Sequence, residues 1–329
     1  MPCDGFGRKI DYLRISVIDQ CNLRCRYCMP MDAGPFAPRS DLLTPAEIGV
    51  VARAAAAVGF RKIRLTGGEP TLRPDLLEIV ATVAEASGLA GLSMTTNGTR
   101  LTSLAAPLAA AGLTRVNVHI DSLDPGRAQR LMRGSAISAS WNGVLAAEAA
   151  GLLPIKLNSV VTRSYNDEDV ALLAALTRDR AWHVRFIETM PLGTAEPAAL
   201  ARSHHVPTAE TRARIEQSLG PLEPVANEDP SDEARNFRLA GAAGIVGFIS
   251  PVSEPYCGSC NRMRLTPTGQ FHLCLLNDDE LDVRRVLRTG GGVTEVAEVL
   301  LRAVAAKPVG HRLHDGHSTK AQQMFQLGG

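Results

Sequence analysis

Three cysteines, Cys21, Cys25 and Cys28, have the spacing C-x3-C-x2-C, which is the most chemically specific pattern in the sequence. An iron–sulfur cube is usually held by four cysteine thiolates, and a structural zinc ion also needs four ligands. No histidine or cysteine occurs in the twenty residues that follow the triplet. The spacing therefore favours a [4Fe–4S] cluster with one iron open to an external ligand, and a zinc site is the alternative.

A second triplet, Cys257, Cys260 and Cys274, lies near the C-terminus. Spacing alone leaves zinc and iron open here, because His272 could complete a Cys3His zinc site. Disulfides are not expected, since a cytosolic compartment keeps thiols reduced. The seventh cysteine, Cys3, is expected to be an uninvolved thiol near the N-terminus.

The stretch Gly67-Gly68-Glu69-Pro70 combines two glycines with a carboxylate. Glycines let another group approach the backbone closely, and the Glu69 carboxylate could receive the ammonium group of a ligand. The alternative is a simple strand-to-helix turn that Glu69 caps. The position of this turn beside the cysteine loop favours the ligand-binding interpretation.

Several basic residues fall in or beside expected strands, where an inward-facing charge is costly without an anionic partner. The planar fork of arginine suits phosphate oxygens. For any single residue, a solvent-facing side chain is the alternative. Together they indicate a phosphate-bearing ligand bound by Arg14, Arg64, Lys156, Arg262 and Arg264.

These residues must be positioned by strands that alternate with helices. Thr44, Pro45 and Glu47 form a helix-start pattern, and Asn166 is expected to cap a later helix. Such alternation implies a parallel sheet. Strands are expected at 12–18, 63–66, 92–96, 116–121, 155–161 and 183–188, and helices at 44–58, after Pro74, and at 101–111, 141–150 and 167–177. Further along the chain, strands are expected at 237–239, 244–248 and 263–265, and helices at 208–219, 282–288 and 293–305.

The expected fold is α/β: an incomplete (β/α)6 TIM-type barrel with a C-terminal extension that carries a second iron–sulfur site. We expect residues 1–220 to form the partial barrel and residues 221–329 to form the extension. Most candidate residues are expected at or near the carboxyl ends of strands, which is where β/α barrels carry active sites. These stretches are Cys21–Cys28, Gly67–Pro70, Thr95–Gly98, His119–Ser122, Lys156 with Asn158, and Glu188 with Met190.

Composition excludes several function classes. The 329 residues are 45% hydrophobic and carry a formal net charge of +1, so charge gives no case for binding nucleic acid or an anionic membrane. Aromatic residues make up 4%, which argues against stacking platforms for single strands. No uncharged run is long enough to span a membrane, and the N-terminus lacks a secretory pattern. A cytoplasmic protein is expected.

The cysteine motif followed by Gly-Gly-Glu-Pro resembles the radical S-adenosylmethionine superfamily. There, the open iron binds the amino and carboxylate groups of S-adenosylmethionine, and reduction cleaves a C–S bond to give a 5′-deoxyadenosyl radical. Leu13-Arg-Ile-Ser16, Cys21–Pro30, the second triplet and the Gly-Gly end together resemble the GTP 3′,8-cyclase family over essentially the whole chain. The resemblance implies a lyase that converts GTP to (8S)-3′,8-cyclo-7,8-dihydroguanosine 5′-triphosphate, the first step of molybdenum cofactor biosynthesis.

The resemblance also implies site residues. The second triplet would hold a second [4Fe–4S] cluster whose open iron binds guanine, and Arg262 or Arg264 would assist reduction of an aminyl intermediate. Gly328 and Gly329 would enter the barrel. At His119 the family commonly has serine. GTP would contact Arg14, Arg64, Thr95, Lys156, Arg262, Met263 and Arg264, and S-adenosylmethionine would contact Tyr27, Gly68, Glu69, His119 and Met190.

The resemblance further implies an external one-electron donor of the flavodoxin or ferredoxin type, and a homodimer or monomer. Two alternatives stay open from the sequence. One is a peptide-modifying enzyme with the same radical chemistry, although such enzymes commonly carry more C-terminal cysteines. The other is a non-catalytic zinc or electron-transfer protein.

Overall fold

The structure, a computed structural model, describes residues 1–134, 137–193, 195–227, 229–315 and 323–328. One sheet of twelve strands runs through it, in the order β12-β11-β10-β1-β2-β3-β4-β5-β6-β9-β8-β7. The six central strands follow chain order and pair in parallel, as the alternation predicts. They are β1 (Tyr12–Ser16), β2 (Lys62–Thr66), β3 (Gly91–Thr96), β4 (Arg115–His119), β5 (Lys156–Val161) and β6 (His183–Glu188).

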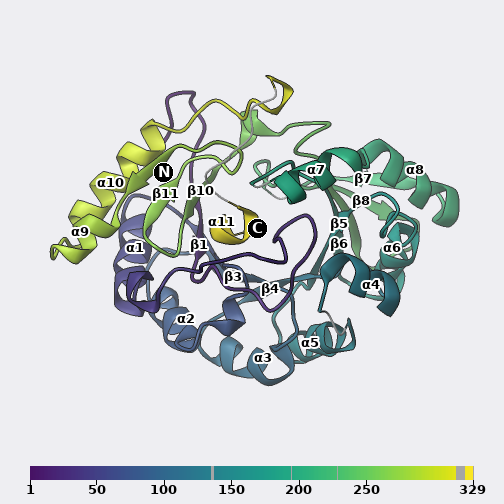
Figure 1. Cartoon of the computed structure of the whole chain (residues 1–329), viewed down its shortest axis with the longest axis horizontal. Coiled ribbons are helices and arrows are strands. Elements are labelled where there is room, and N and C mark those ends of the chain that lie inside the picture. The colour runs from purple at the N-terminus through teal and green to yellow at the C-terminus, as the bar shows by residue number, and fades with distance from the viewer. Residues whose placement is uncertain (135–136, 194, 228, 316–322, 329) are drawn as a thin grey trace.

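Helices cover the outer side of these strands (Figure 1). The first has the predicted capping box, in which Thr44 and Glu47 satisfy each other's backbone N–H groups. An additional helix after the fourth strand was not predicted from the sequence. The helices are α1 (Pro45–Ala57), α2 (Leu76–Ala84), α3 (Leu101–Ala110), α4 (Pro125–Met132), α5 (Ile137–Ala149) and α6 (Val170–Asp179).

The predicted Asn166 cap is wrong. Helix α6 begins at Val170, after Asp169 at its N-cap position. The side chain of Asn166 is used inside the preceding loop, where it accepts from the Thr162 N–H and donates to the carbonyl of Asp121. An asparagine that binds loop backbone in this way offers the chain an alternative to the helix.

The C-terminal half extends the sheet at both flanks rather than forming a separate layer. Strand β9 (Ile245–Ile249) pairs in parallel with β6, and β10 (Arg262–Leu265) pairs in parallel with β1. The helix expected from Asp282 starts at Arg284, because Asp282 ends a strand. Three short strands within this half were missed by the sequence analysis. They are β7 (Leu222–Val225), β11 (Gln270–His272) and β12 (Glu280–Asp282), while β8 (Arg235–Leu239) was predicted in part.

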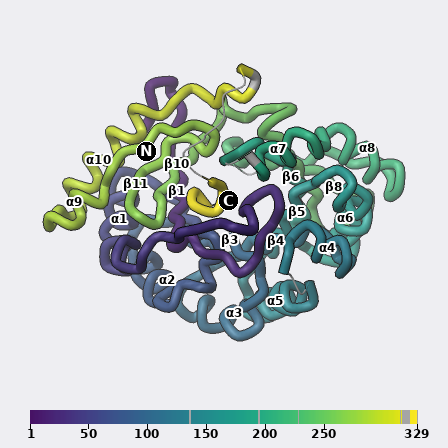
Figure 2. Tube along the Cα trace, in the orientation of Figure 1, coloured from purple at the N-terminus to yellow at the C-terminus, as the bar shows by residue number. Residues whose placement is uncertain are grey.

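The remaining helices are α7 (Ala195–Ser203), α8 (Thr208–Leu219), α9 (Arg284–Arg288), α10 (Val293–Ala305) and α11 (Met324–Leu327). Figure 2 shows the loop after β1, drawn in dark purple, passing across the C-terminal segment. The rings of Phe36 and Phe325 meet edge to face there, with centroids 6.2 Å apart. None of the helices in the described ranges has the length and apolarity needed to cross a membrane.

The core lies between the sheet and the outer helices. Because successive strand residues point to opposite faces, Leu13 and Ile15 of β1 pack in this core with 0% exposure. Arg14, which lies between them, lines a cavity on the other face. The same alternation recurs on β2, so the inner face of the sheet is polar and buried.

Candidate active site

Three arginines stand side by side on the inner face of the sheet. Arg14 of β1 is in register with Arg64 of β2 on one side and with Arg264 of β10 on the other. Their relative exposures are 8%, 5% and 6%. The sequence predicts these three residues separately. Their alignment in register across the sheet follows from the pairing of β1 with β10.

Charge repulsion and burial mark this row as an anion-binding surface. Burial, and then the charge of Arg14, lowers the pKa of Arg264 to about 9. Burial lowers the pKa of Arg64 to about 10, and the charge of Arg14 contributes to this shift. Cations that are destabilised in this way gain when an anion enters. The cavity is therefore suited to a ligand with several negative charges.

A buried carboxylate that the sequence analysis missed lies among these cations. Glu233 Oε1 accepts from Arg14 Nη2 at 2.9 Å, and Glu233 Oε2 accepts from Arg262 Nη1 at 2.7 Å. Burial opposes the charged form, yet Arg14 and Arg262 hold the pKa of Glu233 well below its usual value. The acid-rich link before β8 was visible in the sequence, but nothing in it distinguished Glu233 from its acidic neighbours.

Several of the predicted ligand-binding side chains have buried polar atoms without a partner. Among the described residues, these atoms include Arg14 Nε, Arg262 Nη2 and Thr95 Oγ1. Buried polar groups are normally hydrogen-bonded, so an orphaned donor needs an explanation such as an absent ligand. All three atoms belong to residues that the resemblance assigns to GTP.

The first cysteine triplet lines the same cavity as Arg14, Arg64 and Arg264. Burial raises the pKa of Cys21 to about 11, and burial raises the pKa values of Cys25 and Cys28 further. The neighbouring thiols add to the shift of Cys25 by repelling its charge. Thiolates in such a place need a positive partner, so this donor set fits an iron–sulfur cluster.

No group of three or more histidine, cysteine or acidic side chains within the described ranges is arranged to hold a metal ion. That statement concerns sites for one ion. An iron–sulfur cube is a body of several atoms that thiolates hold from its periphery.

The Gly-Gly turn is packed against the start of the cysteine loop. The Gly68 N–H donates to the Ile18 carbonyl at 2.6 Å, and the Glu69 N–H donates to the Gln20 carbonyl at 2.7 Å. A Cβ atom on Gly68 would lie 2.2 Å from the Gln20 oxygen. Glycine is therefore required at Gly68, because the end of β2 and the cysteine loop approach each other there.

Glu69 has the structural role that the sequence analysis gave as the alternative. It is 1% exposed, and its Oε1 atom accepts from the Thr71 N–H and from the Thr96 hydroxyl. Its Oε2 atom accepts from the Asn97 N–H at 2.7 Å. Glu69 also lines the cavity, so this capping geometry and contact with a ligand are compatible.

Tyr27, His119 and Asp121 form one cluster at the cavity wall. The Tyr27 hydroxyl donates to Asp121 Oδ2 at 2.6 Å and also contacts His119 Nε2. His119 Nε2 lies 2.9 Å from Asp121 Oδ2. Tyr27 and His119 line the cavity beside the cysteines, so the histidine is held by a carboxylate rather than left free.

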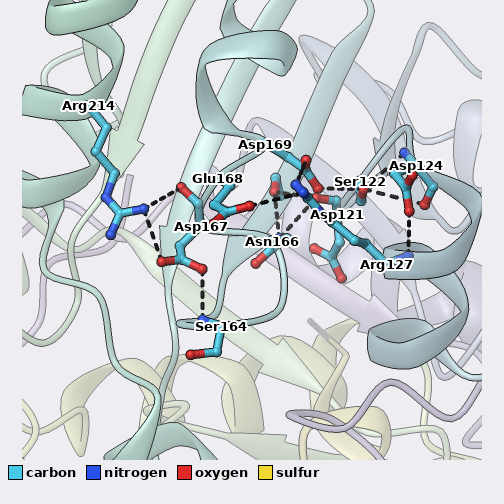
Figure 3. Close-up of polar contacts among 11 residues, drawn as sticks. Asp121, Ser122, Asp124, Arg127, Ser164, Asn166, Asp167, Glu168, Asp169 and Arg214 are labelled. Atoms are coloured by element: carbon cyan, nitrogen blue, oxygen red, sulfur yellow. Dashed lines mark hydrogen bonds and ion pairs between the residues drawn. The ribbon is translucent and has the colours of Figure 1, made fainter.

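Asp121 is itself fixed by a polar network that joins β4, β5 and the loop before α6 (Figure 3). Its Oδ1 atom accepts from the Val160 N–H at 2.8 Å. Beside it, the Ser122 hydroxyl donates to Asp169 at 2.5 Å, and Arg127 pairs with the same Asp169. The network gives the Tyr27–His119–Asp121 cluster a rigid base.

The second triplet lines a neighbouring cavity together with Arg262 and Lys307. Burial would raise the pKa of Cys260, but Arg262 and Lys307 lower it to about 7. His272 does not line this cavity, and its Nδ1 lies 3.2 Å from Glu280. The histidine that does line it is His311. The two cavities share Arg14, Met190, Tyr256, Arg264 and Leu275.

The C-terminal segment lies inside the arc of strands (Figure 1). Met324 and Phe325 line the first cavity, and an Arg264 N–H donates to the Gly328 carbonyl. Gly328 has φ +76°, and a Cβ there would lie 2.2 Å from Thr66. The structure thus agrees with the expected entry of the tail at Gly328, while Gly329 lies outside the described residues.

The other predicted residues differ in whether they reach the two cavities. Met190 lines both cavities. Met263 is 0% exposed and packs in the outer core, so only its backbone is available to a ligand on the inner face. Lys156 is 9% exposed, but it is not among the residues that line either cavity.

Two family descriptions match the chain. Residues 15–176 match the Radical SAM superfamily, and residues 182–313 match Molybdenum Cofactor Synthesis C. A GTP 3′,8-cyclase of Moorella thermoacetica is 44% identical over 326 residues, which cover 99% of both chains. A GTP 3′,8-cyclase of Pseudomonas savastanoi pv. phaseolicola is 43% identical over 329 residues, covering 99% of this chain and 98% of the relative.

Solved structures show a similar fold. Streptococcus suis SuiB bound to S-adenosylmethionine matches with a TM-score of 0.61 and 14% sequence identity. The match covers 88% of this chain and 68% of that chain. At this identity the likeness concerns the fold alone.

Proposed function

The chain belongs to the GTP 3′,8-cyclase family, and on that premise we propose which of its residues perform the reaction. The enzyme is a radical S-adenosylmethionine lyase that converts GTP to (8S)-3′,8-cyclo-7,8-dihydroguanosine 5′-triphosphate, the first step of molybdenum cofactor biosynthesis. Its cofactors are S-adenosylmethionine and two [4Fe–4S] clusters. The observation that carries the residue assignment is a row of arginines between two cavities, each of which is lined by one cysteine triplet.

The first triplet, Cys21, Cys25 and Cys28, would hold the cluster that binds S-adenosylmethionine. When bound, these groups supply a 5′-deoxyadenosyl radical that takes hydrogen from the ribose of GTP. Glu69 would meet the ammonium group of the cofactor, and Gly68 leaves its backbone open to close approach. Tyr27, His119 and Met190 complete the proposed cofactor contacts on the wall of the same cavity.

The arginine row would bind the triphosphate of GTP. The orphaned Arg14 Nε, Arg262 Nη2 and Thr95 Oγ1 atoms are donors that phosphate or ribose oxygens can satisfy. Arg64, Arg264 and Lys156 add positive charge, and Met263 can contribute only its backbone. We assign these seven residues to the substrate, and Arg262 and Arg264 also to catalysis as cations near the base.

The second triplet, Cys257, Cys260 and Cys274, would hold the cluster that receives the guanine base. His272 is turned to Glu280 instead, so a zinc site closed by His272 is not favoured. The triplets would thus hold the cofactor at one end of the joined cavities and the base at the other. Such an arrangement brings the ribose between the two sites, where C3′ and C8 can be positioned.

We propose that residues 1–220 form an incomplete (β/α)6 barrel and that residues 221–329 complete it with the second cluster site. The C-terminal segment would exclude water from the cavity through Met324, Phe325 and Gly328. Exclusion of water keeps a reactive intermediate from side reactions. An external one-electron donor of the flavodoxin or ferredoxin type, a cytoplasmic location, and a monomeric or homodimeric state complete the proposal.

The direct test is anaerobic incubation of the reconstituted protein with S-adenosylmethionine, dithionite and GTP. We expect 5′-deoxyadenosine and the cyclised nucleotide in equal amounts. Replacing Arg14 by Ala should reduce the cyclised nucleotide more than the 5′-deoxyadenosine formed without GTP. If 5′-deoxyadenosine forms with no cyclised nucleotide, the substrate assignment fails while the radical chemistry stands.

A further inference from the structure

Glu233 is the buried acid at the centre of the arginine group. Its side chain is 7% exposed, and it lies 3.9 Å from Arg64 in addition to its hydrogen bonds with Arg14 and Arg262. The cations that it meets come from β1, β2 and β10. The positive charges of Arg14 and Arg262 repel each other. An anion placed between such cations lowers this repulsion.

Two roles are open to such a carboxylate. It can occupy the place of a substrate phosphate and leave when the substrate enters, or it can brace the arginines while their other donors bind the substrate. In the first role Glu233 would use the donors that GTP needs. In the second role those donors would be free in the presence of Glu233.

The free donors decide between these roles. Glu233 binds Arg14 through Nη2 and Arg262 through Nη1. Within the described residues, the Nε atom of Arg14 and the Nη2 atom of Arg262 are buried without a partner. Each guanidinium therefore keeps one buried donor that Glu233 does not use. The Arg262 side chain also bonds the Cys260 side chain, and both arginines line the second cavity.

The attachment of the Glu233 segment to strands on both flanks of the sheet supports the role in which Glu233 braces the arginines. Glu233 lies just before β8 (Arg235–Leu239), whose place in the sheet is far from β1 and β10. Its ion pairs therefore join the two flanks of the sheet across the opening between them. A second pair, Lys62 with Asp229, joins the same link to β2.

We propose that Glu233 is a positioning residue for the substrate, which orients Arg14 and Arg262 so that their remaining donors face the phosphates of GTP. This inference rests on the proposed function, because it takes GTP as the ligand of the arginine row. Glu233 itself contacts the arginines and is not a catalytic residue.

The test measures equilibrium binding of GTP and of guanosine to the anaerobic holoenzyme without reductant, so that no turnover occurs. Glu233→Gln keeps the size of the side chain and removes its charge. Glu233→Asp keeps the charge on a shorter side chain. Asp229→Asn is the matched control, because it breaks the other pair between this link and the strands.

We expect Glu233→Gln to weaken GTP binding about tenfold or more, since Arg14 and Arg262 lose the charged partner that orients their remaining donors. Guanosine, which has no phosphates, should lose less affinity than GTP in the same variant, although Arg262 would also lie near the base. Glu233→Asp should recover part of the affinity, and Asp229→Asn should leave both affinities unchanged. If Glu233→Gln and Asp229→Asn have equal unfolding midpoints, the lost GTP affinity of Glu233→Gln comes from misplaced arginines and not from a loss of fold.

GTP binding to Glu233→Gln that equals or exceeds wild-type binding would overturn the proposal, and tighter binding would show that Glu233 competes with the substrate. Equal losses for GTP and guanosine, or an equal loss in Asp229→Asn, would also overturn it, because these patterns indicate a structural tie. Wild-type holoenzyme that binds no GTP would defeat the proposed function, and this inference with it.

Discussion

At the scale of single residues, the site is defined by buried positive charges that the protein neutralises only in part. Arg14, Arg64 and Arg264 lie in register on three neighbouring strands, and the buried acid among them, Glu233, pairs with only part of their charge. Burying uncompensated cations costs free energy. Under the proposed assignment a polyanionic substrate would supply the missing charge, and this cost should be visible in the pH dependence of binding.

Lys156 gives the pH prediction. Its pKa is lowered to about 7 by burial and by Arg185, whereas a bound triphosphate favours the charged amine and raises that pKa. Binding above pH 7 must therefore take up a proton. GTP affinity should fall by up to about tenfold per pH unit above pH 7, until the pKa of the complex is reached.

Lys156→Arg is the control for this prediction, because a guanidinium stays charged over the same pH range. The affinity of GTP for both proteins should be measured between pH 6.5 and 8, which lies below the pKa of about 9 for Arg264. Titration of the nucleotide itself then cancels in the comparison. A profile for Lys156→Arg that falls as steeply as the wild-type profile would contradict the assignment.

Iron content tests the two triplets separately. Wild-type protein reconstituted without oxygen should hold about eight irons per chain, and Cys25→Ala or Cys260→Ala should each hold about four. Cys3, which is exposed, is the matched control, and Cys3→Ala should keep the full content. Zinc in place of iron in the Cys25→Ala protein would reject a second iron–sulfur cluster.

At the scale of elements, strand ends and the loops after them build the site. The carboxyl ends of β2 and β3 meet at Glu69, which binds backbone or hydroxyl donors of Thr71, Thr96 and Asn97. The end of β2 is also joined to the cysteine loop through Gly68. The position of the first cluster therefore depends on this turn as well as on the cysteines.

Gly68→Ala should lower stability and iron retention together. The added Cβ would lie 2.2 Å from the Gln20 carbonyl oxygen, which cannot move without shifting the cysteine loop. Overpacking of this kind typically costs about 1–3 kcal/mol. Denaturant unfolding and iron content of the anaerobic protein measure the two effects.

Gly91→Ala is the control, because a Cβ at Gly91 would meet its nearest atom at 3.6 Å, an ordinary contact. It should unfold at the wild-type midpoint and keep its iron. If Gly68→Ala behaves like Gly91→Ala, the turn does not position the cysteine loop.

The sequence predicts the elements of the site better than their boundaries. The capping box at Thr44 depends on residues three apart in the chain, so its geometry can be read directly from the sequence. Helix α6 begins later than expected because Asn166 binds the Thr162 N–H in the preceding loop and the carbonyl of Asp121. That competition involves residues that are distant in sequence, and local pattern cannot reveal it.

At the scale of the whole molecule, the C-terminal half completes the site by lying at both flanks of the parallel strands. Strand β10 places Arg262 and Arg264 beside β1, while the link before β8 brings Glu233 to Arg14 and Arg262. The sequence predicted the arginines from their place in or beside expected strands, and the resemblance to a family assigned them to the substrate. It did not identify Glu233 or the common level of the arginine row, because both arise from pairing between segments far apart in the chain.

The proposed arrangement has the two triplets and the arginine row hold GTP with its ribose C3′ toward the S-adenosylmethionine site. GTP carrying deuterium at C3′ tests this claim most directly, in a single anaerobic turnover followed by mass spectrometry of 5′-deoxyadenosine. We predict one deuterium in 5′-deoxyadenosine and none at C3′ of the cyclised product. Unlabelled 5′-deoxyadenosine from this substrate, with deuterium retained in the nucleotide, would contradict the account.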